Sequence, residues 1–187
     1  MRIIGGARRG LKLAEVGTGD MAAHLRPTSD RVREAVFNLL LNGGYGNLAA
    51  GARVLDLFAG TGAFGLEALS RGADHATFVE NGKAALALLS RNIDLMRAAD
   101  QATILRADAT RTGANPGAGY DLIFLDPPYG KSLGEAALAA CMAGRWIAPG
   151  ATVVWEENRP TAPPSGLQQL DQRKYGDTII SLLRADY

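Results

Sequence analysis

Hydrophobic residues along this chain fall into short continuous runs that alternate with stretches of helical spacing. The runs predict strands and the intervening stretches predict helices, because buried strands of a parallel sheet read as unbroken apolar segments. The predicted strands open at residue 53 and then cover residues 76–80, 102–106, 120–125, 151–156, 167–174 and 178–183. The predicted helices run through residues 68–71, from residue 82 towards residue 98, and over residues 133–147. This alternation predicts an α/β fold with a mostly parallel seven-stranded sheet that ends in a C-terminal antiparallel hairpin.

The residues ahead of this sheet predict a small N-terminal extension. Arg2-Ile3-Ile4 and Leu11-Lys12-Leu13 flank a glycine-rich stretch, which predicts a β-hairpin. Arg8, Arg9 and Lys12 place positive charge at its tip. This basic tip is either an arm that contacts RNA phosphates or a solvated turn without a partner.

A helix is predicted after the hairpin, with apolar residues at three- and four-residue steps from Val32 to Leu40. Thr28 or Ser29 is expected to cap its first turn. Three arginines near its start are either solvated charges or groups that cover the cofactor and reach RNA. They are Arg26, Arg31 and Arg33.

Composition sets the class of protein. We expect residues 1–187 to form a single domain, with residues 1–45 as the extension and residues 51–187 as the core. A hydrophobic fraction of 47% and a net charge of +1 indicate an ordinary globular protein. The single cysteine, Cys141, leaves neither a disulfide framework nor a metal cluster, so no metal is predicted. With no leader and no long apolar span, we expect a cytoplasmic protein without a membrane partner. We also expect the protein to be a monomer.

Glycines interrupt the apolar run directly after the first predicted strand. Gly60 and Gly62 let a ligand approach the backbone, and the amides that open the following helix attract electron-rich groups. Together with Gly65 they match the dinucleotide-binding spacing, so the glycines alone do not choose the cofactor. Asp56, inside the strand, repels a pyrophosphate and favours a cationic ligand such as S-adenosylmethionine. The alternative is that Asp56 caps a turn and the glycines only allow close packing.

Acidic residues recur at the ends of the next two predicted strands. Glu80 ends the second strand and is expected to bind the ribose hydroxyls of the cofactor. Asp108 follows the third strand, where it either accepts a hydrogen bond from the adenine amino group or forms a turn. Open parallel sheets bind ligands at the carboxyl ends of their strands, and this recurrence favours the first role. The predicted cofactor site also includes Phe58 and Ala109.

The fourth predicted strand runs into Asp126-Pro127-Pro128-Tyr129-Gly130. Two prolines can neither continue a strand nor begin a helix at once, so the segment predicts a stiff loop. The loop is expected at the same edge of the sheet as the acidic residues. We therefore expect it to carry the chemistry.

The order of these motifs resembles the class I S-adenosylmethionine-dependent methyltransferases that modify exocyclic amino groups and have a Rossmann-like fold. The resemblance implies a catalytic loop of Asp126, Pro127, Pro128 and Tyr129. The Asp126 carboxylate and the Pro127 carbonyl accept the hydrogens of the amino group, which turns its lone pair towards the methyl group. Tyr129 stacks on the base, and the base must be flipped out or already unpaired.

Segments outside these motifs resemble one family within this class, the bacterial 16S rRNA guanine-N2 methyltransferases that act on guanine 966. The matching segments are Arg2-Ile3-Ile4-Gly5-Gly6, Arg9-Gly10, Arg26-Pro27-Thr28, residues 31–38 and Tyr175-Gly176-Asp177-Thr178. The family implies methyl transfer to the N2 amino group of a guanine in 16S rRNA. It also implies 16S rRNA or an assembling 30S subunit as the partner, with the basic tip as an RNA contact.

The sequence is also compatible with two other functions. An adenine-N6 methyltransferase acting on RNA or DNA shares the Asp126–Tyr129 loop, although the chain holds no sizeable domain for recognising a DNA target. A dinucleotide-binding oxidoreductase, or an inactive nucleotide-binding module, uses Gly60, Gly62 and Gly65 but leaves that loop without a role.

Overall fold

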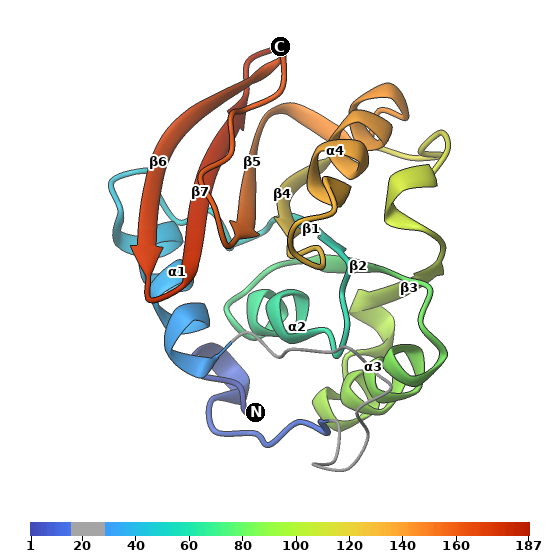
Figure 1. Cartoon of the computed structure of the whole chain (residues 1–187). Coiled ribbons are helices and arrows are strands. Elements are labelled where there is room, and N and C mark those ends of the chain that lie inside the picture. The colour runs from blue at the N-terminus through green and yellow to red at the C-terminus, as the bar shows by residue number, and fades with distance from the viewer. Residues whose placement is uncertain (16–28) are drawn as a thin grey trace.

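The computed structural model describes residues 1–15 and 29–187 (Figure 1). Its α-helices are α1 (Asp30–Asn42), α2 (Ala63–Ser70), α3 (Lys83–Met96) and α4 (Leu133–Ala143). Its strands are β1 (Arg53–Leu57), β2 (His75–Glu80), β3 (Ala102–Arg106), β4 (Tyr120–Leu125), β5 (Ile147–Glu157), β6 (Leu167–Tyr175) and β7 (Thr178–Ala185). The Arg26-Pro27-Thr28 segment, including the proposed Thr28 cap, lies outside the described residues. Ser29 caps α1, since its hydroxyl accepts a hydrogen bond from the Val32 amide at 3.2 Å.

The strands form one sheet in the order β3-β2-β1-β4-β5-β7-β6. Strands β1 to β5 pair in parallel, and β7 runs antiparallel to both β5 and β6. The predicted Rossmann-like α/β fold with its closing antiparallel hairpin is therefore confirmed. Strands β2 and β3 lie on one side of β1 and strand β4 lies on the other, so the strand order reverses at β1. Ligands bind open sheets at such a switch point.

Side chains of the central strands alternate between two hydrophobic layers. In β1, Val54 packs in the layer formed with α1, α2 and α3, whereas Leu55 packs in the layer formed with α4. Figure 1 shows α2 and α3 on one side of the sheet and α4 on the other. In the first layer the rings of Phe64 and Phe124 stack with their centroids 4.9 Å apart. By this alternation the next residue, Asp56, points into the layer of α2.

The position of Arg33 differs from the expectation that the arginines of this helix are solvated or reach RNA. Its side chain is fully buried, with Nε 3.6 Å from Oε2 of Glu67 and Nη2 2.9 Å from Oδ1 of Asp30. Glu67 is equally buried on α2 and also pairs with Nε of Arg71 at 2.7 Å. Arg33 is therefore neither solvated nor available to RNA. It holds α1 against α2.

The N-terminal extension folds back on itself as a short antiparallel hairpin, as the sequence predicts. Arg2 and Lys12 form a β-bridge, and a 3-10 turn (Gly6–Arg8) lies between the two sides. The amide of Ile3 also donates to the Leu11 carbonyl at 2.9 Å, and the amide of Leu13 donates to the Met1 carbonyl at 3.2 Å. Glu67 accepts hydrogen bonds from the amides of Ile4 and Gly5, each at 2.8 Å. Because these bonds go to α2 rather than to a facing strand, the extension is anchored on the core.

Helix α4 ends before the predicted limit at residue 147. Gly144 follows it as the C-cap, and Arg145 takes a positive φ of 59°, which ends the helix. The Trp146 ring stacks on Tyr120 with the centroids 5.9 Å apart. Ile147 pairs with Tyr120 and opens β5 at residue 147 rather than at 151.

Candidate active site

The loop between β1 and α2 uses backbone conformations that L residues seldom adopt. Phe58 has a φ of 59°, Gly60 of 55° and Gly62 of 81°. A positive φ at a residue such as Phe58 costs roughly 1–3 kcal/mol, and such strain concentrates at ligand sites. Gly62 also packs tightly, since a Cβ there would lie 2.5 Å from a methyl carbon of Leu89. The glycine at position 62 therefore serves the packing of the loop.

Asp56 is almost completely buried beneath this loop, with 3% of its surface exposed. Its Oδ2 accepts a hydrogen bond from the Gly65 amide at 2.9 Å, in the first turns of α2. Burial raises the pKa of Asp56 to about 8; the Gly65 hydrogen bond opposes this rise and the nearby Glu80 carboxylate adds to it. The carboxyl group is thus largely protonated at neutral pH. A cation placed beside it would favour the ionised form.

Glu80 ties together the loops that follow β1 and β2. Its Oε2 accepts a hydrogen bond from the Gly60 amide at 2.9 Å. Its Oε1 accepts from the amides of Asn81 and Gly82, at 2.9 and 2.7 Å. These bonds orient a half-buried carboxylate at the edge of the sheet.

Asp108 and Ala109 follow β3 but face different surroundings. Asp108 is exposed, and its Oδ1 accepts hydrogen bonds from the amide and the hydroxyl of Thr110, at 2.8 and 2.7 Å. These bonds from Thr110 lower the pKa of Asp108, so the carboxylate is ionised at neutral pH. Asp108 therefore forms a turn and also borders the cavity described below. Ala109 is buried in the hydrophobic layer of α4.

The Asp126–Tyr129 loop follows β4 at the same edge of the sheet. Asp126 and Tyr129 are half-buried, Pro127 is buried and Pro128 is exposed. The Tyr129 hydroxyl donates a hydrogen bond to Oε1 of Glu156 at 2.9 Å, which fixes the direction of the ring. Burial, more than the neighbouring carboxylates, raises the pKa of Tyr129, so its hydroxyl keeps its proton.

Most of the predicted site residues surround one cavity of about 790 Å³ at the carboxyl ends of the strands. The predicted residues that line it are Asp56, Phe58, Gly60, Glu80, Asp108, Asp126, Pro127, Pro128 and Tyr129. Gly62 and Ala109 do not line it. Its volume lies within the range of about 300–1,000 Å³ that is typical of small-molecule sites.

The cavity is also lined by residues that were not predicted from the sequence. They include Glu15, Ser29, Val32, Thr61, Asn81, Lys131, Leu133, Glu156 and Thr178. Glu156 was detectable, because it lies near the end of β5 just as Glu80 ends β2. Ser29 and Val32 were not, because no local pattern tells which end of α1 packs over the sheet.

The basic tip lies apart from this cavity. Arg8, Arg9 and Lys12 are exposed, and none of them lines the cavity. Hydrogen bonds hold the tip on α2, from the Arg8 amide to the Ser70 hydroxyl at 2.9 Å and from that hydroxyl to the Gly5 carbonyl at 2.6 Å. The three cations make no ion pair with any residue in the described part of the chain.

Among residues 1–15 and 29–187, no cluster of three or more His, Cys, Asp or Glu side chains could hold a metal ion. The helices in those same ranges are all too short or too polar to cross a membrane.

Comparison with known proteins fits this geometry. The sequence profile of the family described as Conserved hypothetical protein 95 matches residues 1–184. The chain belongs to this family. Ribosomal RNA small subunit methyltransferase D of Escherichia coli K12 is 38% identical over 167 residues, covering 87% of this chain and 79% of that protein. The Haemophilus influenzae protein of the same name is 32% identical over 181 residues, covering 94% of this chain and 89% of that protein.

Solved structures of two relatives share the fold over the whole chain. Escherichia coli yhhF superposes with a TM-score of 0.84 at 33% identity, covering 100% of this chain and 98% of that one. Haemophilus influenzae HI0767 superposes with a TM-score of 0.78 at 29% identity, with the same coverage. The resemblance to the 16S rRNA methyltransferases is thus confirmed at the level of the family.

Proposed function

We propose that this protein transfers a methyl group from S-adenosylmethionine to the exocyclic N2 amino group of a guanine in 16S rRNA. The observation that carries the proposal is the meeting of two residue sets in one cavity. Asp56 and Glu80 suit the cofactor, and the Asp126–Tyr129 loop suits a planar base that bears an amino group. The names of the family's relatives support ribosomal RNA as the substrate.

The donor set fits S-adenosylmethionine. A buried carboxyl group whose pKa is raised to about 8 is costly to ionise alone, and a cationic ligand relieves that cost. We assign Asp56 to the positively charged amino-acid end, Glu80 to the ribose hydroxyls and Asp108 to the adenine amino group. Phe58 and Gly60 complete the surface against the cofactor. When bound, the cofactor supplies an electrophilic methyl group on a sulfonium.

The Asp126–Tyr129 loop then prepares the amino group for methyl transfer. An exocyclic amino nitrogen is a poor nucleophile because its lone pair is delocalised into the ring. In the proposal, the Asp126 carboxylate and the Pro127 carbonyl accept its hydrogens, which localises the lone pair and stabilises the positive charge that develops. Tyr129 stacks on the base while Glu156 fixes its hydroxyl. Pro128 stiffens the loop.

The substrate approaches as an unpaired nucleotide, since a base inside a stack cannot reach this cavity. We propose that the exposed basic tip of Arg8, Arg9 and Lys12 contacts RNA phosphates outside it. Either free 16S rRNA or an assembling 30S subunit fits this arrangement.

Product analysis tests the proposal. The purified protein is incubated with deuterium-labelled S-adenosylmethionine and 16S rRNA, as transcript or as 30S subunits, and the digested nucleosides are analysed by mass spectrometry. We expect labelled N2-methylguanosine with the wild type and a near-complete loss of label with Asp126→Ala, which removes the proposed hydrogen-bond acceptor. Labelled N6-methyladenosine would favour the adenine-N6 alternative. Binding of NAD but not S-adenosylmethionine would favour the oxidoreductase.

A further inference from the structure

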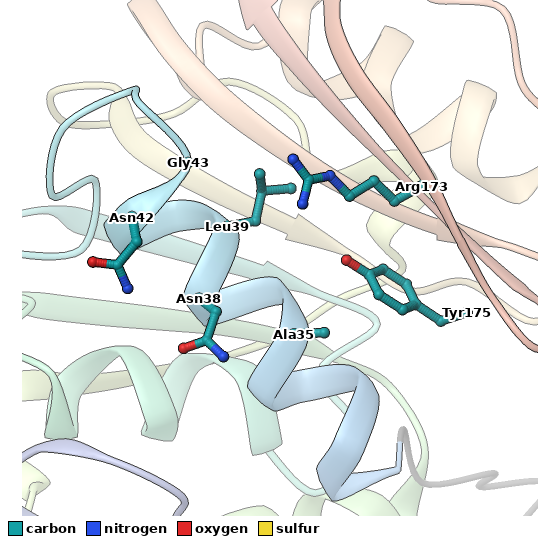
Figure 2. Close-up of a pocket in the computed structure, with 7 residues that line it drawn as sticks. All are labelled: Ala35, Asn38, Leu39, Asn42, Gly43, Arg173 and Tyr175. Carbon is teal, nitrogen blue, oxygen red and sulfur yellow. The ribbon is translucent and has the colours of Figure 1, made fainter.

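A second hollow lies outside the candidate active site, between α1 and β6 (Figure 2). This α1–β6 groove has a volume of about 480 Å³, and its lining includes Asn38 and Asn42 of α1 and Arg173 and Tyr175 of β6. Figure 2 shows the side chains of Arg173 and Tyr175 reaching towards α1. Nothing in the proposed mechanism uses these residues.

The α1–β6 groove lies next to the active-site cavity, along α1 and along the β6–β7 hairpin. On α1, Val32 lines the cavity, and Ala35 and Leu39, one and two turns further on, line the groove. Val32 and Leu39 are about 10 Å apart along the helix axis. On the hairpin, Thr178 lines the cavity, Tyr175 lines the groove, and the two residues pair across the β6–β7 turn. A chain that enters the cavity can therefore leave along the groove.

The chemistry of the groove suits a nucleotide. The exposed amides of Asn38 and Asn42 lie one helical turn apart and can both donate and accept hydrogen bonds. Tyr175 offers a half-buried aromatic ring on which a base can stack. The Arg173 guanidinium, 48% exposed, is held by Asp171 with Nη2 2.9 Å from Oδ2, so it is oriented and partly neutralised. Amides and a ring are typical of sites for unpaired RNA, whereas duplex binding relies on many phosphate contacts.

We propose that the α1–β6 groove holds an unpaired nucleotide that flanks the target base in the RNA substrate. This inference rests on the proposed function, whose cavity the groove adjoins. The Tyr175 ring stacks on the flanking base, Asn38 and Asn42 bond to its edge or to its ribose, and Arg173 contacts a phosphate. The groove would thereby select substrates in which the residues beside the target are also unpaired.

The test measures the affinity of each variant for a 16S rRNA transcript in the presence of S-adenosylhomocysteine, which prevents turnover. Tyr175→Ala should weaken RNA binding about 5- to 150-fold, the range for losing one base stack. Tyr175→Phe keeps the ring and should stay within about twofold of the wild type. Tyr187→Ala is the matched control, because Tyr187 is 52% exposed and lies outside the groove.

The double variant Asn38→Ala/Asn42→Ala provides a second arm that does not endanger the fold, since both residues are exposed and alanine favours helix. It should lose roughly tenfold in RNA affinity through its lost hydrogen bonds. S-adenosylmethionine affinity should be unchanged in every variant.

Wild-type RNA affinity in both Tyr175→Ala and the double asparagine variant would overturn the inference. So would losses that appear only with 30S subunits and not with the free transcript, because the groove would then contact protein. If the wild type methylates the transcript and the variants bind it with wild-type affinity, the role of the α1–β6 groove is refuted and the proposed function stands. If the wild type neither binds nor methylates RNA, both the proposed function and the role of the α1–β6 groove are refuted.

Discussion

Replacing Asp56 with asparagine should remove the pH dependence that the protein contributes to S-adenosylmethionine binding. In the free protein, burial holds the pKa of Asp56 at about 8, so the ionised form is the minority below that pH. If the cationic cofactor binds only the ionised form, its apparent affinity scales with the ionised fraction. That fraction rises about ninefold from pH 6 to pH 7 and about fivefold more by pH 8. The contribution of Asp56 to the affinity should therefore increase as pH rises and level off above the pKa of Asp56.

Asparagine is the matched substitution, because its side-chain oxygen can still accept the 2.9 Å hydrogen bond from the Gly65 amide. The measurement is isothermal titration calorimetry from pH 6 to pH 8.5 on wild type and Asp56→Asn. The amino group of the cofactor titrates near pH 8 as well, but it does so for both proteins, so the ratio of their affinities isolates Asp56. At the upper end the variant should bind about tenfold or more weakly, as expected for losing a charged partner. Parallel pH profiles for the two proteins, or a ratio of wild-type to variant affinity that falls between pH 6 and pH 8, would refute this role.

Two further predictions concern the fold and the RNA contact. Glu67→Gln should lower the free energy of unfolding by about 3 kcal/mol in denaturant titrations, because it leaves the buried Arg33 without its carboxylate partner on α2. Glu34→Gln, at an exposed position of α1, should change it by less than about 0.5 kcal/mol, and equal effects of the two substitutions would contradict the structural role of Glu67. The slope of log RNA affinity against log salt concentration should become shallower by about two to three when Arg8, Arg9 and Lys12 are all replaced by alanine. Removing three exposed cations elsewhere, Arg91, Arg106 and Arg184, should have a smaller effect, and identical slopes for the two triple variants would show the basic tip to be a structural cover only.

The central strands could be predicted from the sequence because they are buried on both faces, as in β1 and β4. β4 matches the predicted residues 120–125 without a shift, and the more exposed edge strand β3 matches residues 102–106. The errors arise where tertiary contacts decide. Nothing local shows that Trp146 stacks on Tyr120 and so draws Ile147 into β5. Likewise, Arg33 has the sequence pattern of a solvated charge, and only the packing of α1 on α2 pairs it with Glu67.

The candidate site was predictable to the extent that it lies at strand ends. Glu80 ends a predicted strand, Asp108 and Asp126 follow predicted strands, and a parallel sheet gathers such residues at one edge. The same rule would have found Glu156. The rule could not foresee that Asp56 bonds to the Gly65 amide, or that Gly62 serves packing, because both depend on where α2 lies over the sheet. The α1–β6 groove likewise depends on two segments far apart in the chain.

Nucleoside analysis of 16S rRNA from living cells tests the central claim most directly. The RNA is compared between a strain that lacks this protein, the same strain complemented with the wild type, and the strain complemented with Asp126→Ala. We predict that N2-methylguanosine at one position disappears on deletion, returns with the wild type and does not return with the variant. An unchanged set of methylated guanosines in the deletion strain, or full restoration by Asp126→Ala, would contradict the account.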